Sequence, residues 1–454
     1  MEQSAYLLET PVKKLFFKFA VPSVISMVIA CLYNIVDQIF VGQGVGVNGN
    51  AATGIVFPIT VIALAVAMMF GDGIAAFLAI SHGRGDHKNS NRAVATGLTC
   101  ALILSVVLVI VCYSLGDMIY YALGATENTI ALARVYGQII IAALPIFVLG
   151  QSLSSVIRAD GNPKYAMICV LSGAVLNCIL DPIAIFALGW GIEGAAIATI
   201  IGQLVTFALA FVYLFRTKTF RITRKDWKPN GKVLRTVSAL GMGSFLTQIS
   251  IVVVTIVNNI LIVSYGAKSI YGAEIPLGTF VVIMKLFQIV LCFAMGISFG
   301  VMPVIGYNYG AKRYDRVRQV FKYVLVSTLI LGVVSTIIFM GIPHVCVSIF
   351  GGAGDTLYME FAVKCLRIYL MLVLFVCLQK ACAIFLQSIG KTKFAIPLSL
   401  FREIICLTVF AVILPIALGI DGIFWAAPLA DALSLLVTGV VTFFALRRLP
   451  KTAQ

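Results

Sequence analysis

An asparagine and an aspartate stand four positions apart inside an apolar stretch that runs from about Tyr165 to Leu188. On a helix, Asn177 and Asp181 share one face, because side chains at this spacing project in the same direction. An ionisable group at the centre of a bilayer costs roughly 2.5–3.5 kcal/mol on insertion scales. Pro182 follows directly and lacks an N–H, so it is expected to kink the helix beside the carboxylate. This stretch predicts the ion-coupling centre of a transporter.

A second acid, Asp37, lies toward the outer end of the first apolar stretch, and Thr199 lies at a similar depth in another. Asp37 and Asp181 could meet there and titrate as a coupled pair, which suits a proton carrier. With Asn177 and Thr199, the same oxygens also suit a hard cation such as Na⁺. Simpler interpretations remain open. Asp37 could reach interfacial water, Asp181 could cap backbone groups at the kink, and Thr199 could bond its own helix.

Three further charged residues lie within apolar stretches and are candidates for the wall of a substrate cavity. Asp72 stands between two glycines, and its alternative role is that of a structural hydrogen-bond partner. Lys285 and Lys380 lie in the second half of the chain. They either pair with acids across the helices or line the cavity, where they would contact anionic groups of a substrate. Other charged residues of this half stand nearer the predicted span ends: Glu274, Arg402, Glu403 and Asp431.

The elements that carry these side chains are predicted to be membrane-spanning helices. Of the 454 residues, 61% are hydrophobic and 11% are charged, and the mean hydropathy is +1.05. Apolar runs long enough to cross a bilayer recur along the whole chain. The sequence therefore predicts an all-α polytopic membrane protein with twelve transmembrane helices, at about 15–40, 53–80, 93–115, 130–157, 164–188, 192–215, 237–264, 276–304, 319–341, 361–387, 395–418 and 422–446.

The basic residues indicate the orientation of these spans. Most of the 33 Lys and Arg residues fall in loops or span ends on the side of the N-terminus. Four fall on the opposite side: Arg134, Lys268, Lys364 and Arg367. Because cytoplasmic loops are enriched in Lys and Arg, we expect both termini to be cytoplasmic. The net charge of +15 is thus a topology signal, and we expect no nucleic-acid partner.

The chain is also an internal repeat. The segment Gly191-Ile-Glu-Gly matches Gly419-Ile-Asp-Gly, and Ile35-Val-Asp matches Ile256-Val-Asn, in the same order and at similar offsets. Two halves of six spans each would share one orientation. They should form two six-helix bundles related by a pseudo-two-fold axis along the membrane normal. We therefore predict an N-lobe over residues 1–215, a basic cytoplasmic linker over 216–236 and a C-lobe over 237–454.

No pattern for catalysis or for a resident metal emerges. The 11 cysteines show no metal-ligand spacing, and no nucleophile stands with a base in a recognisable arrangement. We expect neither an enzyme nor a cofactor. The expected partners are the lipid bilayer and a small transported molecule.

At this point the chain resembles the multidrug and toxic compound extrusion (MATE) family, and most closely its prokaryotic DinF-type branch. The resemblance covers nearly the whole chain and rests on three local patterns beside the twelve spans. These are Pro22 with Asp37 in the first span, the loop Arg158-Ala-Asp-Gly-Asn-Pro-Lys164, and the series Asn177-x-x-x-Asp181-Pro182 followed by Gly191-Ile-Glu-Gly-Ala-Ala-Ile-Ala-Thr199.

The resemblance implies a multi-pass cell-membrane antiporter that exports amphipathic, mostly cationic compounds by alternating access in exchange for H⁺ or Na⁺. It places the cation-coupling site at Asp37, Asn177, Asp181 and Thr199, with Tyr136 bordering it. The presence of Lys380 argues against a second cation site in the C-lobe. The alternative function is an exporter or flippase of an anionic metabolite or lipid-linked substrate, and it rests on Lys285 and Lys380.

Overall fold

The computed structural model is an all-helical bundle, described for residues 7–127, 129–217, 219–227, 230–272, 274–350 and 356–450. Positions 218, 228 and 229 of the predicted linker and the outermost ends of both predicted lobes lie outside these ranges. No strand occurs among the described residues. Within these ranges, ten helices are long and apolar enough to cross a membrane, or up to twelve if each of two bent pairs forms one span. This confirms the predicted class of fold.

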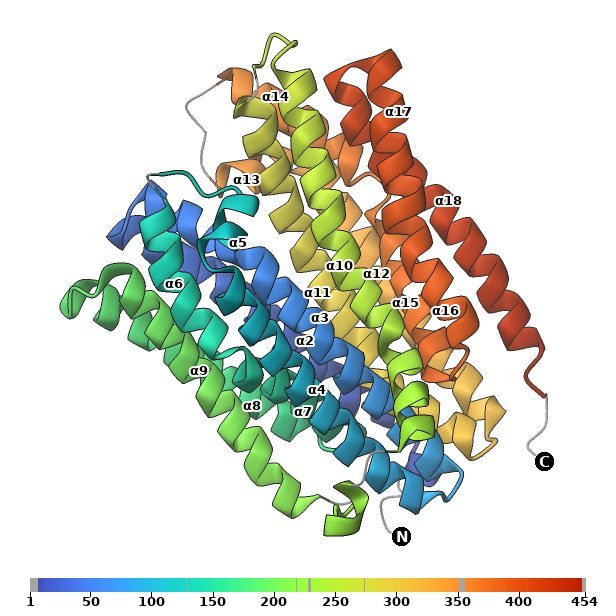
Figure 1. Cartoon of the computed structure of the whole chain (residues 1–454). Helices are drawn as coiled ribbons and strands as arrows, with labels where there is room; N and C mark the ends of the chain where they lie inside the picture. Colours follow the sequence, from blue (N-terminus) through green and yellow to red (C-terminus); the bar gives the residue numbers. More distant parts are fainter. Residues whose placement is uncertain are drawn as a thin grey trace.

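The first half of the chain (blue to green in Figure 1) folds into α2 (Val12–Gly44), α3 (Val47–Gly83), α4 (His87–Leu115), α5 (Asp117–Ala122), α6 (Ile130–Ala142), α7 (Leu144–Ala159), α8 (Pro163–Pro182), the π-helix η1 (Ile183–Ala187), α9 (Gly191–Tyr213) and the short 3₁₀ helices η2 (Leu214–Arg216) and η3 (Arg224–Trp227).

The second half (yellow-green to red) folds into α10 (Gly231–Gly266), α11 (Glu274–Gly310), α12 (Tyr314–Gly341), α13 (Pro343–Ser348), α14 (Thr356–Tyr369), α15 (Val373–Ser388), α16 (Thr392–Leu400), the π-helix η4 (Phe401–Leu407), α17 (Thr408–Leu418) and α18 (Ile420–Arg447).

Two predicted spans are bent rather than straight. The span predicted at 130–157 is α6 followed by α7, with an angle of 50° between them, and the span at 361–387 is α14 followed by α15, with an angle of 41°. The first break has a visible cause, since Pro145 stands in the first turn of α7, where a missing N–H is tolerated. The second break contains no proline.

The linker is anchored to the first half. Asp160, at the end of α7, accepts hydrogen bonds from the Tyr213 hydroxyl at 2.7 Å and from the Thr219 backbone N–H at 2.8 Å. Phe220 is only 3% exposed and belongs to the hydrophobic core of the first half. The helix α10 already begins at Gly231, where the Asn230 side chain caps it, so residues 231–236 of the predicted linker are helical.

Both described chain ends lie at one end of the bundle, at the start of α12. The Arg316 guanidinium donates to the Thr10 carbonyl at 2.5 Å, and Arg318 donates to the Leu449 carbonyl at 2.6 Å. The two halves also meet closely near this end, through glycines. A Cβ on Gly241 of α10 would stand 1.7 Å from the Met69 carbonyl oxygen of α3, so the two backbones touch. A Cβ on Gly310 of α11 would likewise stand 2.2 Å from the Ile80 oxygen. These contacts define the glycine seam.

We expect the Gly241→Ala variant to lose stability, because the added methyl group cannot fit against the α3 backbone. Overpacking of this kind typically costs about 1–3 kcal/mol. The matched control is Gly54→Ala on α3, where nothing lies within 4 Å of the new Cβ. Thermal unfolding of the purified protein in detergent measures both. Equal melting temperatures for the two variants would contradict the close contact.

Candidate functional site

The asparagine and aspartate of α8 form the core of a polar site inside the first half. Asp181 is fully buried and Asn177 is 2% exposed. The Asn177 amide nitrogen donates to Asp181 Oδ1 at 3.1 Å and lies 3.5 Å from the Thr199 hydroxyl of α9. The structure therefore brings three of the predicted site residues together, from two adjacent helices.

Asp37 of α2 lies beside this group, with its carboxyl group within interaction range of that of Asp181. Three oxygens of the site are buried and have no hydrogen-bond donor among the described residues: Asp37 Oδ1, Asp181 Oδ2 and Asn177 Oδ1. Buried acceptors without a partner are costly, each by about 1–3 kcal/mol. A shared proton or a small hard cation would satisfy them, since both provide the positive charge that the oxygens lack.

Two tyrosines border the acid pair. Tyr136 of α6, which is 8% exposed, lies within electrostatic range of both Asp37 and Asp181, as the resemblance implied. Tyr33 of α2 occupies the same surroundings and was missed from the sequence. It stands four positions before Asp37, so the helical period was the signal that could have identified it. The tyrosine also lines a small cavity together with Asn177 and Thr199.

The helix that carries Asp181 widens directly after the site. The helix α8 ends at Pro182 and passes directly into the π-helix η1. A π turn absorbs the register change that the missing proline N–H causes, and such turns are frequent at functional sites. At the proline where the sequence predicts a kink, the structure therefore has a local widening of the helix.

Asp72 does not join this site. Its Oδ1 accepts a hydrogen bond from the Ser155 hydroxyl at 3.0 Å, and Arg158 donates to the same hydroxyl at 2.7 Å. Both partners lie on α7, and Asp72 and Arg158 are 3% and 8% exposed. This arrangement fits the structural hydrogen-bonding role that the sequence left open. Arg158, which the sequence assigned to an inner loop, is part of the packed interior.

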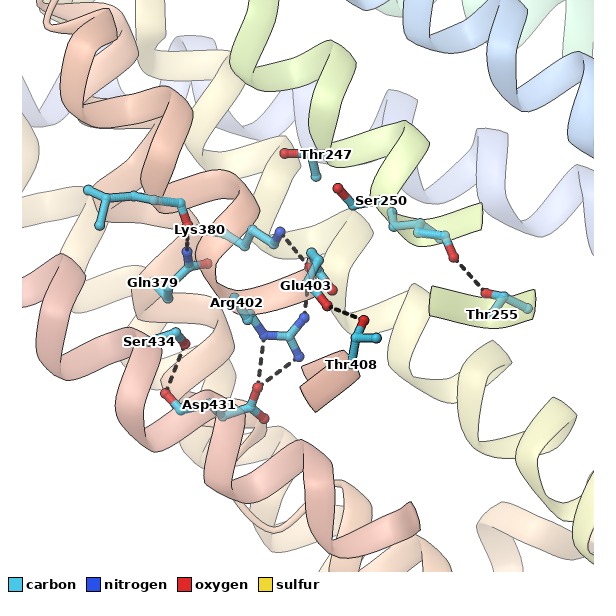
Figure 2. Close-up of polar contacts among 12 residues, drawn as sticks. Thr247, Ser250, Thr255, Gln379, Lys380, Arg402, Glu403, Thr408, Asp431 and Ser434 are labelled. Atoms are coloured by element: carbon cyan, nitrogen blue, oxygen red, sulfur yellow. Dashed lines mark hydrogen bonds and ion pairs between the residues drawn. The ribbon is translucent and has the colours of Figure 1, made fainter. Parts of the chain in front are cut away.

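The second half holds a buried cluster of four charged side chains, which we call the C-lobe charge cluster: Lys380, Arg402, Glu403 and Asp431 (Figure 2). Glu403 Oε1 accepts from Lys380 at 3.0 Å and from Arg402 at 2.7 Å. Arg402 also contacts Asp431 Oδ1 at 2.8 Å through two of its nitrogens. All four are at most 5% exposed. The expectation that Arg402, Glu403 and Asp431 lie nearer span ends is wrong, because η4 and the middle of α18 carry them into the interior.

The two lysines of the second half differ. Lys380 pairs with Glu403 and also lines a cavity between the halves. Lys285 has no ion pair among the described residues, and its ammonium group lies 5.8 Å from the centre of the Phe350 ring. This distance allows a cation–π contact. Only Lys380 therefore combines the two roles that the sequence left open, pairing and cavity lining.

Comparisons with known proteins agree with this architecture. The MatE family model matches residues 22–183 and 243–413. The multidrug export protein MepA of Staphylococcus aureus (strain MRSA252) is 26% identical over 450 residues, which cover 99% of this chain and 97% of that protein. MepA of Staphylococcus haemolyticus is 24% identical over 449 residues, with the same coverage.

Solved structures share the fold over nearly the whole chain. One is an outward-facing conformation of a multidrug resistance MATE family transporter, with a TM-score of 0.90 and 24% identity. Another is a transporter from Pyrococcus furiosus, also with a TM-score of 0.90 and 24% identity, described as having a binding pocket of reverse polarity. Each comparison covers 99% of both chains.

Proposed function

Because the chain belongs to the MATE family of multidrug efflux transporters, and is a multi-pass membrane transporter rather than an enzyme, we propose that it exports amphipathic organic cations in exchange for H⁺ or Na⁺. The observation that carries this proposal is the Asp37–Asp181 pair with its buried, partnerless oxygens. A transporter that exchanges ions needs a site whose oxygens lack partners when no ion is bound and gain a positively charged partner when the ion binds.

The coupling follows from differential affinity between two states. Loading the acid pair cancels negative charge beside α2 and removes the cost of its unsatisfied oxygens. If the ion binds better to one arrangement of the helices and the exported cation to the other, each ligand lowers the affinity for its competitor by the same factor. The neighbouring Asn177 and Thr199 provide further oxygens for the ion, and Tyr136 lies within electrostatic range of both acids.

We further propose that residues 1–215 and 237–454 move as two lobes about the linker at 216–236. The basic loops support cytoplasmic termini and a place in the cell membrane. In that orientation the glycine seam closes the cytoplasmic end, and the acid pair, near the outer end of α2, is loaded from outside. The assignment to the DinF-type branch rests on the location of the acid pair in the N-lobe.

The alternative of an exporter for purely anionic substrates has weaker support. It depends on Lys285 and Lys380 as free positive charges in the cavity. The Lys380 charge is balanced by Glu403, and Lys285 faces an aromatic ring rather than the cavity between the halves. The cavity also presents Met68, Met295 and Phe299, which suit flat or flexible apolar groups of an organic cation.

The direct test is efflux of a cationic dye from vesicles that contain the purified protein. We expect an imposed inward gradient of protons or of sodium to drive dye movement, and the effective gradient identifies the coupling ion. Vesicles with equal ion concentrations on both sides serve as the control. If the rate of dye efflux were the same with and without each gradient, ion-coupled exchange would be refuted.

A further inference from the structure

The cavity beside Lys380 is lined mostly by the second half, and Met68 of α3 joins it from the first half. Ser244, Thr247 and Gln248 of α10 present polar groups to it, and Met68, Met295 and Phe299 present apolar side chains. Lys380 of α15 is the only charged residue among the described residues that line it. In Figure 2, Thr247 lies beyond Lys380 on the side away from Asp431, so the lysine stands between the cavity and the rest of the C-lobe charge cluster.

The Lys380 ammonium group has unused hydrogen-bonding capacity. It carries three N–H donors, and Glu403 accepts from it at 3.0 Å. Among the described residues it has no other hydrogen-bond acceptor, although Lys380 is only 5% exposed. A buried ammonium is stable only when its donors are used. Its remaining donors therefore provide binding positions for an acceptor that enters the cavity.

The residues behind Lys380 hold it in place. Arg402 donates to both Glu403 and Asp431, and its guanidinium lies 5.3 Å from the centre of the Phe287 ring. Arg402 therefore holds Glu403 in place whether or not the cavity is occupied. Glu403 in turn orients the Lys380 ammonium group from the side opposite the cavity. A charged group that binds an anion is held rigidly when the residues that contact it are themselves held by further hydrogen bonds.

The charges of the cluster decide which ligand fits. Two cations and two carboxylates cancel, so a bound monoanion would add an uncompensated charge in a poorly solvated place. A carboxylate that arrives with its own cationic group adds no net charge. The N-lobe acids, in turn, favour positive charge. These conditions point to a zwitterion rather than to a pure anion.

We propose that Lys380 is a specificity-determining subsite that binds the carboxylate of zwitterionic amphiphiles. The inference rests on the proposed export function, and it assigns the residue that selects, among the exported molecules, those that carry a carboxylate as well as an amine. The carboxylate accepts hydrogen bonds from the Lys380 ammonium group, and the aromatic part of the molecule lies against Phe299 and the methionines.

The test uses two dyes that differ only at the carboxylate: tetramethylrhodamine, a zwitterion, and its methyl ester, a cation. Binding to the full-length protein is followed by fluorescence polarisation. In the Lys380→Met variant we expect the acid to bind about tenfold more weakly, as the loss of a charge-assisted hydrogen bond implies. The ester should bind as it does to the unmodified protein. Equal effects on both dyes, or none on either, would overturn the proposal.

Two further variants control for the possibility that a folding defect, rather than the lost ammonium group, weakens binding. Lys380→Met combined with Glu403→Gln removes one charge of each sign and should show the same selective loss for the acid. Lys285→Met removes the other membrane-embedded lysine, which does not line the cavity, and should change neither affinity. Gradient-driven export of the ester is measured separately. If the ester were not exported, ion-coupled exchange would be contradicted. The difference in binding affinity between the acid and the ester tests the role of Lys380 alone.

Discussion

The Asp181→Asn variant is expected to bind a cationic dye but to lose gradient-driven export of it. The substitution keeps the size of the side chain and its contact with Asn177, but it removes one of the two carboxylates that would hold the ion. Loss of a charged partner of this kind is worth about 1.5–3 kcal/mol, or about a 10- to 100-fold weaker affinity for the coupling ion. Dye efflux from vesicles under the effective gradient measures the result.

Asp37→Asn should give the same phenotype, because the two carboxyl groups act as one site. The matched control is Glu193→Gln, which neutralises an exposed acid at the start of α9 and should export at the normal rate. Normal export by both the Asp37 and Asp181 variants would show that the coupling ion binds elsewhere.

The Arg402→Met variant is expected to be the most destabilising single change in the C-lobe. Arg402 is fully buried and contacts both acids of the C-lobe charge cluster, so its removal leaves Asp431 without its cation. Breaking a buried ion pair by deleting one partner typically costs about 3–5 kcal/mol, a large share of the 5–15 kcal/mol that stabilises a protein. Thermal unfolding in detergent, followed by tryptophan fluorescence, measures this loss.

Two comparisons isolate the electrostatic cause. Arg402→Met combined with Asp431→Asn removes one charge of each sign, leaves the Lys380–Glu403 pair intact, and should recover much of the lost stability. Lys364→Met breaks the exposed pair with Asp421 and should cost at most about 1 kcal/mol. If Arg402→Met melted at the same temperature as Lys364→Met, the cluster would not be important for stability.

The helical architecture could be predicted from the sequence because a bilayer imposes a length and a polarity on every span. All twelve predicted spans correspond to a long helix or to a bent pair. The sequence left open whether Asp37 and Asp181 meet, and in the structure their carboxyl groups lie within interaction range. The bend between α6 and α7 had a visible cause in Pro145, whereas the bend between α14 and α15 had no proline to indicate it.

The partners of the buried charges could not be predicted in the same way. Spans that are apolar on most of their circumference have no clear inward face, so the sequence did not show whether Lys380 meets an acid or the cavity. Ion pairing between α15, η4 and α18 depends on how the helices pack in three dimensions. The same limit applies to Tyr33, whose position beside Asp37 became meaningful only when α6 and α8 were placed around it.

The attachment of the linker to the first half sets a mechanical limit on how the transporter can change shape. Asp160 and the core around Phe220 hold the linker to the first half as far as Phe220, and the 3₁₀ helix η3 follows at Arg224–Trp227. Trp227 and Asn230 are three peptide units apart, a reach of about 10 Å at full extension. If the two halves move as the proposed lobes, this short connection allows them to tilt relative to each other but not to separate widely at that end.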